Sequence, residues 1–215
     1  LDVVRYILRG DKFESPTVRR MLRLCVVASD TALLSDVCEH LVAGNRHVAI
    51  AHPDGKHQIV SQRSVIQKLV HDDAQLLKTK LQDANLPSWK RVINAYETWT
   101  ARKAFESMVA YDITSLPVCD VNTRAVDVIS ASDILHTCRT NFNLDKTIKA
   151  CKEDSRKFTK KAAALPSTLI SCTPEDTLAV ALEKMLNENI HHVYVLDAHG
   201  SPVGVVSFVD VLRML

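Results

Sequence analysis

Glycine is scarce in this chain, and the glycine-rich loops that commonly hold phosphates are absent. Five glycines occur in 215 residues, and none of them forms the G-x-G-x-x-G or G-x-x-x-x-G-K-[ST] pattern of a dinucleotide site or a P-loop. The six cysteines form no C-x-x-C pair, so the usual zinc and dithiol motifs are excluded and reduced, buried thiols are expected. Any nucleotide must therefore be held in another way.

The chain also lacks a dominant charge and a long apolar run. Its net charge is +2 with both signs interspersed, so the basic stripe of a nucleic-acid-binding protein is missing. The basic cluster at 156–161 is best interpreted as a solvated helix face or linker. No stretch approaches the ~20 apolar residues that span a bilayer, and the start shows no signal peptide. The sequence predicts a soluble chain of the cytoplasm, and of the nucleus as well, without nucleic-acid or membrane partners.

What the chain does have is a unit of about fifty residues that recurs. In the clearest copy, an alternating strand at 192–197 is followed by a tight turn, a second strand, and Ser207-x-x-Asp210 opening an amphipathic helix. The same order recurs at 115–135, where Asp133 lies 77 positions before Asp210. A degraded copy at 47–66 has Ser64 where the aspartate should be. Function should therefore be sought in sites that the repeats share.

The repeats divide the chain into segments. We predict the tail helix of a truncated first repeat at 1–10, a linker at 11–23, a repeat at 24–75, a linker at 76–90, a repeat at 91–140, a linker at 141–164 and a repeat at 165–215. Helices are expected at 18–22, 33–42, 65–70, 71–81, 100–110, 147–152 and 178–186. Each repeat is therefore a β-α-β-β-α unit.

The predicted fold class is α/β (α+β). A unit of ~50 residues has a small core and leaves one apolar face of its sheet uncovered. We therefore expect the units to pair through their sheets with pseudo-twofold symmetry. Ligand clefts would form where strand ends and helix N-termini of two repeats converge.

The Ser-x-x-Asp helices, the strand at 116–118 and the Asp-Ala-His-Gly turn at 197–200 resemble tandem CBS domains, or Bateman modules, over nearly the whole chain. The resemblance is most specific over 116–215, where the segments 125–133, 143–145 and 190–192 follow the order of the last two repeats in gamma subunits of AMP-activated (Snf1-type) protein kinases. Gamma-type proteins carry four repeats in two pairs, sense AMP, ADP and ATP, and bind a catalytic alpha and a scaffolding beta subunit. The resemblance implies the same ligands and partners here.

The resemblance also implies a set of nucleotide-binding residues. In this family the aspartate of [ST]-x-x-D accepts hydrogen bonds from ribose hydroxyls, while the neighbouring hydroxyl and basic residues face the phosphates. This chemistry is sound, because a carboxylate accepts from vicinal hydroxyls and a helix N-terminus favours phosphate. The implied ligand-binding residues are Thr114, Ser130, Asp133, His191, His192, Ser207, Asp210 and Arg63. We expect no catalytic residue, because no nucleophile stands at a recognisable spacing from a base, and no metal ligands or cofactor.

A second interpretation stays open beside this one. Ser at the N-cap and Asp at N3 also form a capping box, which stabilises a helix by ~1 kcal/mol without any ligand. In addition, Ser64 replaces an aspartate, His192 stands where gamma chains often place an arginine, and Arg46-His47 reverses the usual order. The two hypotheses are a non-catalytic adenine-nucleotide sensor that controls a kinase, and a CBS scaffold that only mediates interactions. A homodimer is compatible with both.

Overall fold

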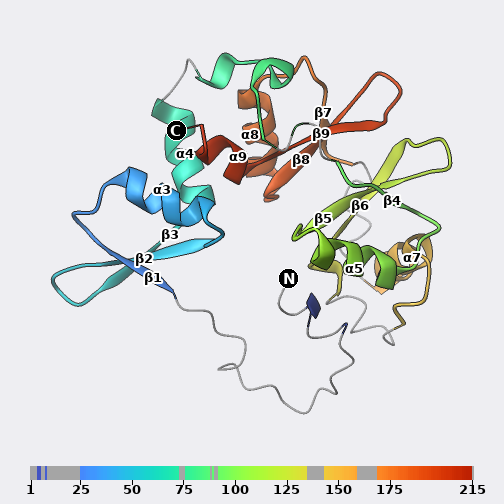
Figure 1. The fold of residues 1–215 in the computed structure, drawn as a ribbon, viewed down its shortest axis with the longest axis horizontal. Helices are drawn as coiled ribbons and strands as arrows, with labels where there is room; N and C mark the ends of the chain where they lie inside the picture. The colour runs from blue at the N-terminus through green and yellow to red at the C-terminus, as the bar shows by residue number, and fades with distance from the viewer. Residues whose placement is uncertain are drawn as a thin grey trace, which may run out of the picture. The chain divides into compact units, whose positions relative to one another are not determined.

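The chain folds into two compact units, each built from segments that are distant in sequence (Figure 1). The computed structural model describes residues 4–5, 8, 25–72, 76–87, 89, 92–134, 143–158 and 169–214. Unit 1 comprises 1–22, 92–169 and 198–202, and unit 2 comprises 23–91, 170–197 and 203–215. The helix expected at 18–22 lies outside the described residues. No helix in the described ranges is long and apolar enough to cross a membrane.

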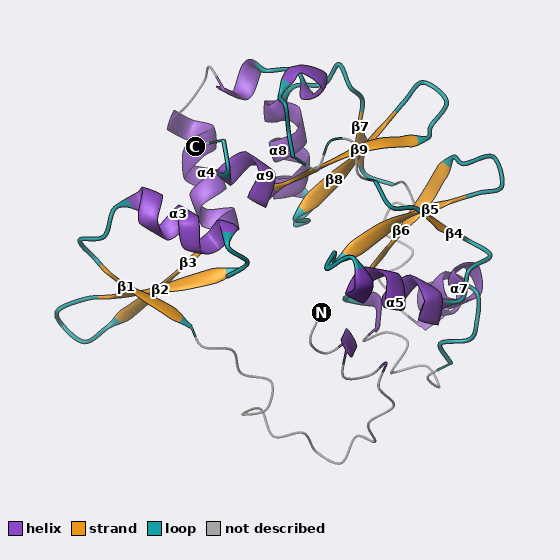
Figure 2. Ribbon diagram, in the orientation of Figure 1, coloured by secondary structure: helices purple, strands orange, loops and turns teal. Residues whose placement is uncertain are grey.

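In its described residues, unit 1 shows the β-α-β-β part of one repeat and a linker helix. Its elements are β4 (Ala95–Tyr96), α5 (Ala101–Ala110), β5 (Ser115–Cys119), β6 (Ala125–Ser130) and α7 (Ile148–Phe158). The sheet has the order β4-β5-β6, with β4 parallel and β6 antiparallel to β5 (Figure 2). Phe105, Leu116 and Ile148 lie in one core cluster, so α7 is packed onto the repeat that precedes it.

Thr100 fixes the start of α5 and connects it to the linker. Its side chain accepts a hydrogen bond from the Lys103 amide, and its backbone forms a β-bridge with Thr147, directly before α7. The turn of the last repeat's hairpin also belongs to unit 1, because the Ala125 amide donates to the Gly200 carbonyl at 2.9 Å.

Unit 2 contains two repeats. The first consists of β1 (Val26–Ser29), α3 (Leu34–Val42), β2 (His47–Ala51), β3 (His57–Ser61) and α4 (Gln62–Asp72), followed by the 3₁₀ helices η1 (Leu76–Lys78) and η2 (Leu81–Asp83). The second consists of β7 (Ser171–Cys172), α8 (Leu178–Asn187), β8 (His192–Leu196), β9 (Pro202–Ser207) and α9 (Phe208–Leu212). Their sheets have the orders β1-β2-β3 and β7-β8-β9.

These two repeats pack against each other through their helices. Helix α4 contacts α8 and α9, and α3 contacts α9. Leu41 and Ile66 from the first repeat share a core cluster with Met185 and Val211 from the second. The reason is that each helix pair has an apolar face of its own, which the helices of the other repeat cover.

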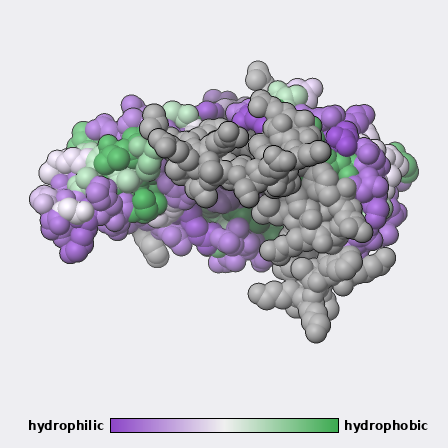
Figure 3. All heavy atoms as spheres, turned by 90° about the horizontal axis from the view of Figure 1, so that it is seen from below, coloured by the Kyte–Doolittle hydropathy of each residue, from purple (hydrophilic) through white to green (hydrophobic). Residues whose placement is uncertain are grey.

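The outer face of the sheet β1-β2-β3 stays uncovered within unit 2. Val27 and Ile59 flank Ala49 in one cross-strand row, and they are 58% and 57% exposed. Figure 3 shows apolar side chains gathered on the part of the surface that carries these strands. The inner face, with Val48 fully buried, packs toward the helices.

Most predicted helices are confirmed within a residue or two, with three exceptions. Helix α4 begins at Gln62 rather than 65, and α7 continues to Phe158 rather than ending at 152. The described part of the helix expected at 71–81 consists of the end of α4, up to Asp72, and the 3₁₀ helix η1. Lys80 forms a β-bridge with Thr177, and this bridge draws the backbone away from an α-helical path.

Candidate functional site

The two intact Ser-x-x-Asp motifs share the contact from the serine amide to the aspartate carboxylate, and the motif of α9 adds the reverse contact. In α9, the Ser207 amide donates to Asp210 Oδ2 at 2.9 Å, and the Asp210 amide donates to Ser207 Oγ at 3.3 Å, which completes a capping box. In unit 1, the Ser130 amide donates to Asp133 Oδ2 at 2.7 Å. The helix-cap interpretation is therefore correct as far as it goes.

The degraded copy retains the cap but has no carboxylate. The Ser61 amide donates to Ser64 Oγ at 2.9 Å, and the Ser64 amide donates to Ser61 Oγ at 3.1 Å. A serine thus replaces the aspartate as a capping partner at the start of α4. It offers no acceptor comparable to a carboxylate for two ribose hydroxyls.

Each cap uses only one oxygen of its carboxylate. The amide and hydroxyl of Ser207 both bond to Asp210 Oδ2, and those of Ser130 both bond to Asp133 Oδ2. Among the described residues, neither Oδ1 atom has a hydrogen-bond donor. The Asp210 side chain is held in a buried place, since the residue is only 3% exposed. Capping and ligand binding are therefore compatible at one carboxylate.

Thr114 and His191 occupy equivalent places in the two intact repeats. The carbonyl of Thr114 accepts from the Ala131 amide at 2.8 Å, and that of His191 accepts from the Phe208 amide at 3.2 Å. The His191 ring also lies edge-on to the Phe208 ring, with centroids 5.7 Å apart. Both predicted residues therefore lie beside a Ser-x-x-Asp motif, in unit 1 and unit 2 respectively.

A basic cluster, consisting of Arg46, His47, Arg63 and His191, forms in unit 2. Burial, and then the positive charges of Arg46, Arg63 and His47, lower the pKa of His191. Arg63 is carried by α4 of the first repeat and reaches the second, where its Nη2 donates to the Leu186 carbonyl at 2.5 Å. Two repeats thus concentrate positive charge near the start of α9. The sequence pointed to Arg63 and His191, whereas Arg46 and His47 were noted only as an unusual pair.

His192 has a different environment from its neighbour. Successive strand residues point to opposite faces, and the His192 ring lies edge-on to Tyr194 with centroids 5.3 Å apart. Burial, and secondly the charge of His191, lower the pKa of His192 to about 4. The ring is therefore neutral at physiological pH and lacks the permanent charge of an arginine. Its role as a nucleotide contact stays a prediction.

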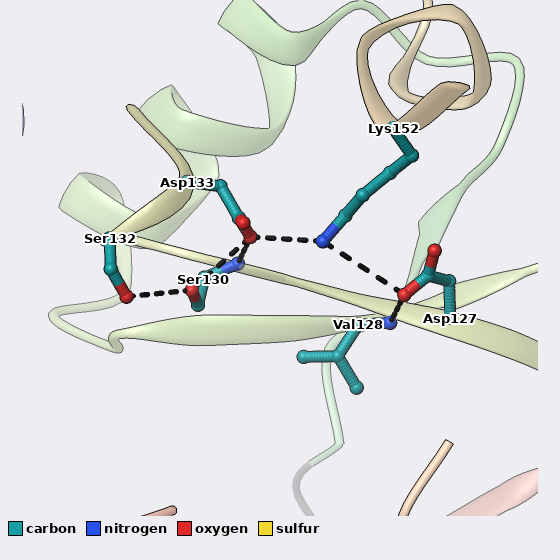
Figure 4. Close-up of polar contacts among 6 residues, drawn as sticks. All are labelled: Asp127, Val128, Ser130, Ser132, Asp133 and Lys152. Atoms are coloured by element: carbon teal, nitrogen blue, oxygen red, sulfur yellow. Dashed lines mark hydrogen bonds and ion pairs between the residues drawn. The ribbon is translucent and has the colours of Figure 1, made fainter. Parts of the chain in front are cut away.

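Asp133 in unit 1 has a partner that sequence reasoning missed. Lys152, on α7, places its Nζ 3.1 Å from Asp133 Oδ2 and 3.9 Å from Asp127 Oδ1. Figure 4 shows the lysine reaching from its helix toward both carboxylates. No motif marks this residue, because only the return of the linker helix onto the repeat brings it to the site.

The described residues offer no metal site, and two of their buried thiols are unreactive. They contain no group of three His, Cys, Asp or Glu side chains that could hold a metal ion. Burial raises the pKa of the Cys119 and Cys172 thiols to about 11. These thiols are therefore protonated, and unreactive as nucleophiles, at neutral pH.

Solved structures show which fold this is. A protein of Methanocaldococcus jannaschii, described as a candidate archaeal homologue of the AMP-activated kinase gamma subunit, matches with a TM-score of 0.71 and 17% identity. The match covers 99% of this chain and 80% of that one. The mixed α/β architecture of tandem CBS repeats predicted from the sequence is thereby confirmed.

Curated relatives and a family model give the family. The chain is 22% identical over 169 residues to subunit gamma-3 of bovine 5'-AMP-activated protein kinase, covering 78% of this chain and 33% of that protein. It is 27% identical over 175 residues to regulatory subunit gamma-1 of the SNF1-related protein kinase of Arabidopsis thaliana, covering 73% and 41%. The chain thus spans less than half the length of these relatives.

These homologues are regulatory subunits and not enzymes in themselves, in agreement with the prediction of a non-catalytic chain. The CBS domain model matches residues 85–139 and 165–215, which correspond to the two repeats with intact Ser-x-x-Asp motifs. The chain therefore carries two CBS domains and is homologous to the gamma-type regulatory subunits of AMP-activated and SNF1-related protein kinases.

Proposed function

We propose that this chain is a regulatory module that binds adenine nucleotides at its Ser-x-x-Asp sites and passes their occupancy to a protein kinase. One observation carries the proposal. In unit 2, a buried carboxylate with a free oxygen, Asp210, lies in the same short helix as Phe208, which the ring and carbonyl of His191 contact. His191 in turn belongs to the basic cluster. Hydroxyl acceptor and anion-attracting charge are thus combined, as a nucleotide requires.

The two halves of a nucleotide fit these two groups. Ribose hydroxyls would donate to Asp210 Oδ1, which the helix cap leaves free. The phosphates would face Arg46 and Arg63, whose guanidinium groups are always charged and form strong hydrogen bonds with phosphate oxygens. The preference for adenine, and for AMP, ADP or ATP, rests on the relatives, which are named as subunits of AMP-activated and SNF1-related kinases.

The cluster also supplies a route from ligand to regulation. Arg46, His47 and Arg63 belong to the first repeat of unit 2, and His191 belongs to the second. A nucleotide bound there contacts both repeats, so it stabilises the arrangement in which they are joined. Ligands that differ in phosphate number would stabilise that arrangement to different extents, which is the requirement for a population shift.

Thermal unfolding with AMP, ADP, ATP and GTP tests the sensing half. A ligand at about 100 times its Kd should stabilise the chain by ~2.7 kcal/mol. We expect adenine-selective stabilisation that Asp210→Asn and Arg63→Gln reduce. Asp54→Asn, on an exposed turn where Asp54 pairs only with Lys56, is the control and should bind normally. A folded sample that responds to no nucleotide would refute sensing.

Kinase control is tested separately by co-purification with kinase alpha and beta subunits in cytoplasmic extract. We expect a complex whose kinase activity changes with AMP. The competing proposal, a CBS scaffold without nucleotide control, is favoured by the Ser61–Ser64 pair, which retains the fold's cap without a carboxylate. A complex whose formation and activity respond neither to AMP nor to Asp210→Asn would establish that scaffold.

A further inference from the structure

The two intact Ser-x-x-Asp sites obtain positive charge from different sources. The Asp210 site has the basic cluster, contributed by two repeats. The Asp133 site has Lys152, contributed by the linker helix α7 of its own unit. Thr114, which takes the place of His191 in unit 1, carries no charge. Among the described residues, Lys152 is therefore the cation that unit 1 places against its carboxylate.

The path of the linker explains why unit 2 has no such lysine. Both linkers begin alike, since the amides of Ile148 and Leu81 donate to the carbonyls of Trp99 and Asp176, each just before a repeat helix. In unit 1 the linker then continues as the eleven-residue helix α7. In unit 2 it makes the single turn η2 and reverses at Asn85, whose φ is 46°. Among the described residues, a linker side chain thus reaches the aspartate in unit 1 alone.

The contacts around Asp133 separate its two oxygens by role. Oδ2 receives the Ser130 amide at 2.7 Å, Ser130 Oγ at 3.2 Å and Lys152 Nζ at 3.1 Å. Oδ1 receives no donor from the described residues. One oxygen is therefore an available acceptor, while two side-chain donors, a hydroxyl and an ammonium, converge beside the other.

The Lys152 ammonium has N–H donors that its contacts within the chain do not use. An ammonium carries three N–H donors, and its contact with Asp127 Oδ1 at 3.9 Å is an ion pair too long for a hydrogen bond. The side chain is 21% exposed, so the ammonium is held in place without being sealed off. Without this charge, the carboxylates of Asp127 and Asp133 would repel a phosphate.

We propose that Lys152 is a nucleotide-binding residue of the Asp133 site and makes that site selective for phosphorylated nucleosides. This inference rests on the proposed function. A ribose hydroxyl donates to Asp133 Oδ1, and the phosphate accepts from Lys152 Nζ and Ser130 Oγ. Linker helix α7 is then part of the binding site. A bound phosphate accepts a hydrogen bond from Lys152, the same residue whose contact with Asp133 joins α7 to the repeat.

The test compares AMP with adenosine, which share base and ribose and differ in the phosphate. Calorimetric titrations use the full chain with Asp210→Asn, which weakens the other site. Lys152→Met should weaken AMP binding about tenfold, or ~1.4 kcal/mol, and change adenosine binding by less than about twofold. Lys152→Arg should retain most AMP affinity. The control is Lys149→Met, on the same helix, where Lys149 is 61% exposed and pairs with Glu97 at 3.7 Å.

Each outcome has a distinct meaning. Equal losses for AMP and adenosine would assign Lys152 a purely structural role, and unchanged AMP affinity would exclude it from the site. If the chain without substitutions binds AMP but Lys152→Met has no effect, this inference fails and the proposed function stands. If that chain binds neither compound, the proposed function fails and this inference fails with it.

A second measurement does not depend on the folding of Lys152→Met. The second ionisation of a phosphate monoester has a pKa of about 6, and an adjacent ammonium lowers it. Phosphorus NMR of AMP bound to the Asp210→Asn chain should therefore show a lowered phosphate pKa. A bound phosphate that titrates like free AMP would overturn the proposal.

Discussion

Acidification should destabilise unit 2 through His192. The pKa of this ring is lowered to about 4 in the folded chain by burial and by the charge of His191, against about 6.5 in an unfolded chain. Between these values the unfolded chain binds more protons than the folded one. Stability therefore falls as the pH drops through 6.5 and levels off below 4.

The magnitude follows from the two pKa values. Each unit of difference corresponds to ~1.36 kcal/mol, so the full loss below pH 4 is about 3.4 kcal/mol, and lowering the pH from 7.5 to 5.0 costs about 2 kcal/mol. For a typical urea dependence of ~2 kcal/mol/M, the midpoint of unfolding should fall by about 1 M. This change is large enough to separate from smaller contributions of surface groups.

Urea unfolding of the chain and of His192→Gln measures this effect. Both carry Trp99→Phe, so that the fluorescence comes from Trp89 in unit 2. The substitution of His192 retains a polar side chain but removes the titration, so it should abolish about 2 kcal/mol of the pH dependence. His57→Gln, at the exposed start of β3, should leave the pH dependence intact. Parallel stability-versus-pH curves for the chain and His192→Gln would refute the reasoning.

One further substitution and one chemical labelling experiment test the packing. Gly204→Ala should destabilise unit 2 by ~1–3 kcal/mol, because an added Cβ would lie 3.0 Å from Cε3 of the Trp89 ring; an unfolding midpoint equal to that of the parent chain would show that the ring moves aside freely. At pH 8, Cys25, which is exposed, should react rapidly with a thiol reagent. Cys119 and Cys172, with pKa raised to about 11 by burial, should react only after unfolding, and equal rates with and without urea would contradict their burial.

Local features of this fold could be predicted from sequence because the interacting residues are neighbours. The capping contact between Ser207 and Asp210 depends on a spacing of three positions. The alternation of apolar residues gave the strands, and the helical spacing gave α3, α5 and α8 to within a residue or two. The absence of a carboxylate at position 64 could also be predicted, because the sequence itself shows a serine there.

Features that depend on distant segments could not be predicted in this way. Arg63 meets the Leu186 carbonyl across 123 positions, and Lys152 meets Asp133 only because α7 returns to its repeat. The helix-to-helix packing in unit 2 was not predicted, because an uncovered sheet face and an uncovered helix face have the same apolar signature. Side-chain composition alone does not say which of the two the neighbouring repeat covers.

The discontinuous build of unit 2 has a consequence for the chain during its synthesis. The first repeat is separated from the second by 79 positions, from Arg91 to Ile170, and translation at ~5–20 residues per second takes about 4–16 s to cross them. Unit 1 has most of its residues by then, whereas Leu41 and Ile66 still lack the helices that bury them. The first repeat of unit 2 therefore waits for the second, and this waiting time is the interval in which chaperones and proteases have access to it.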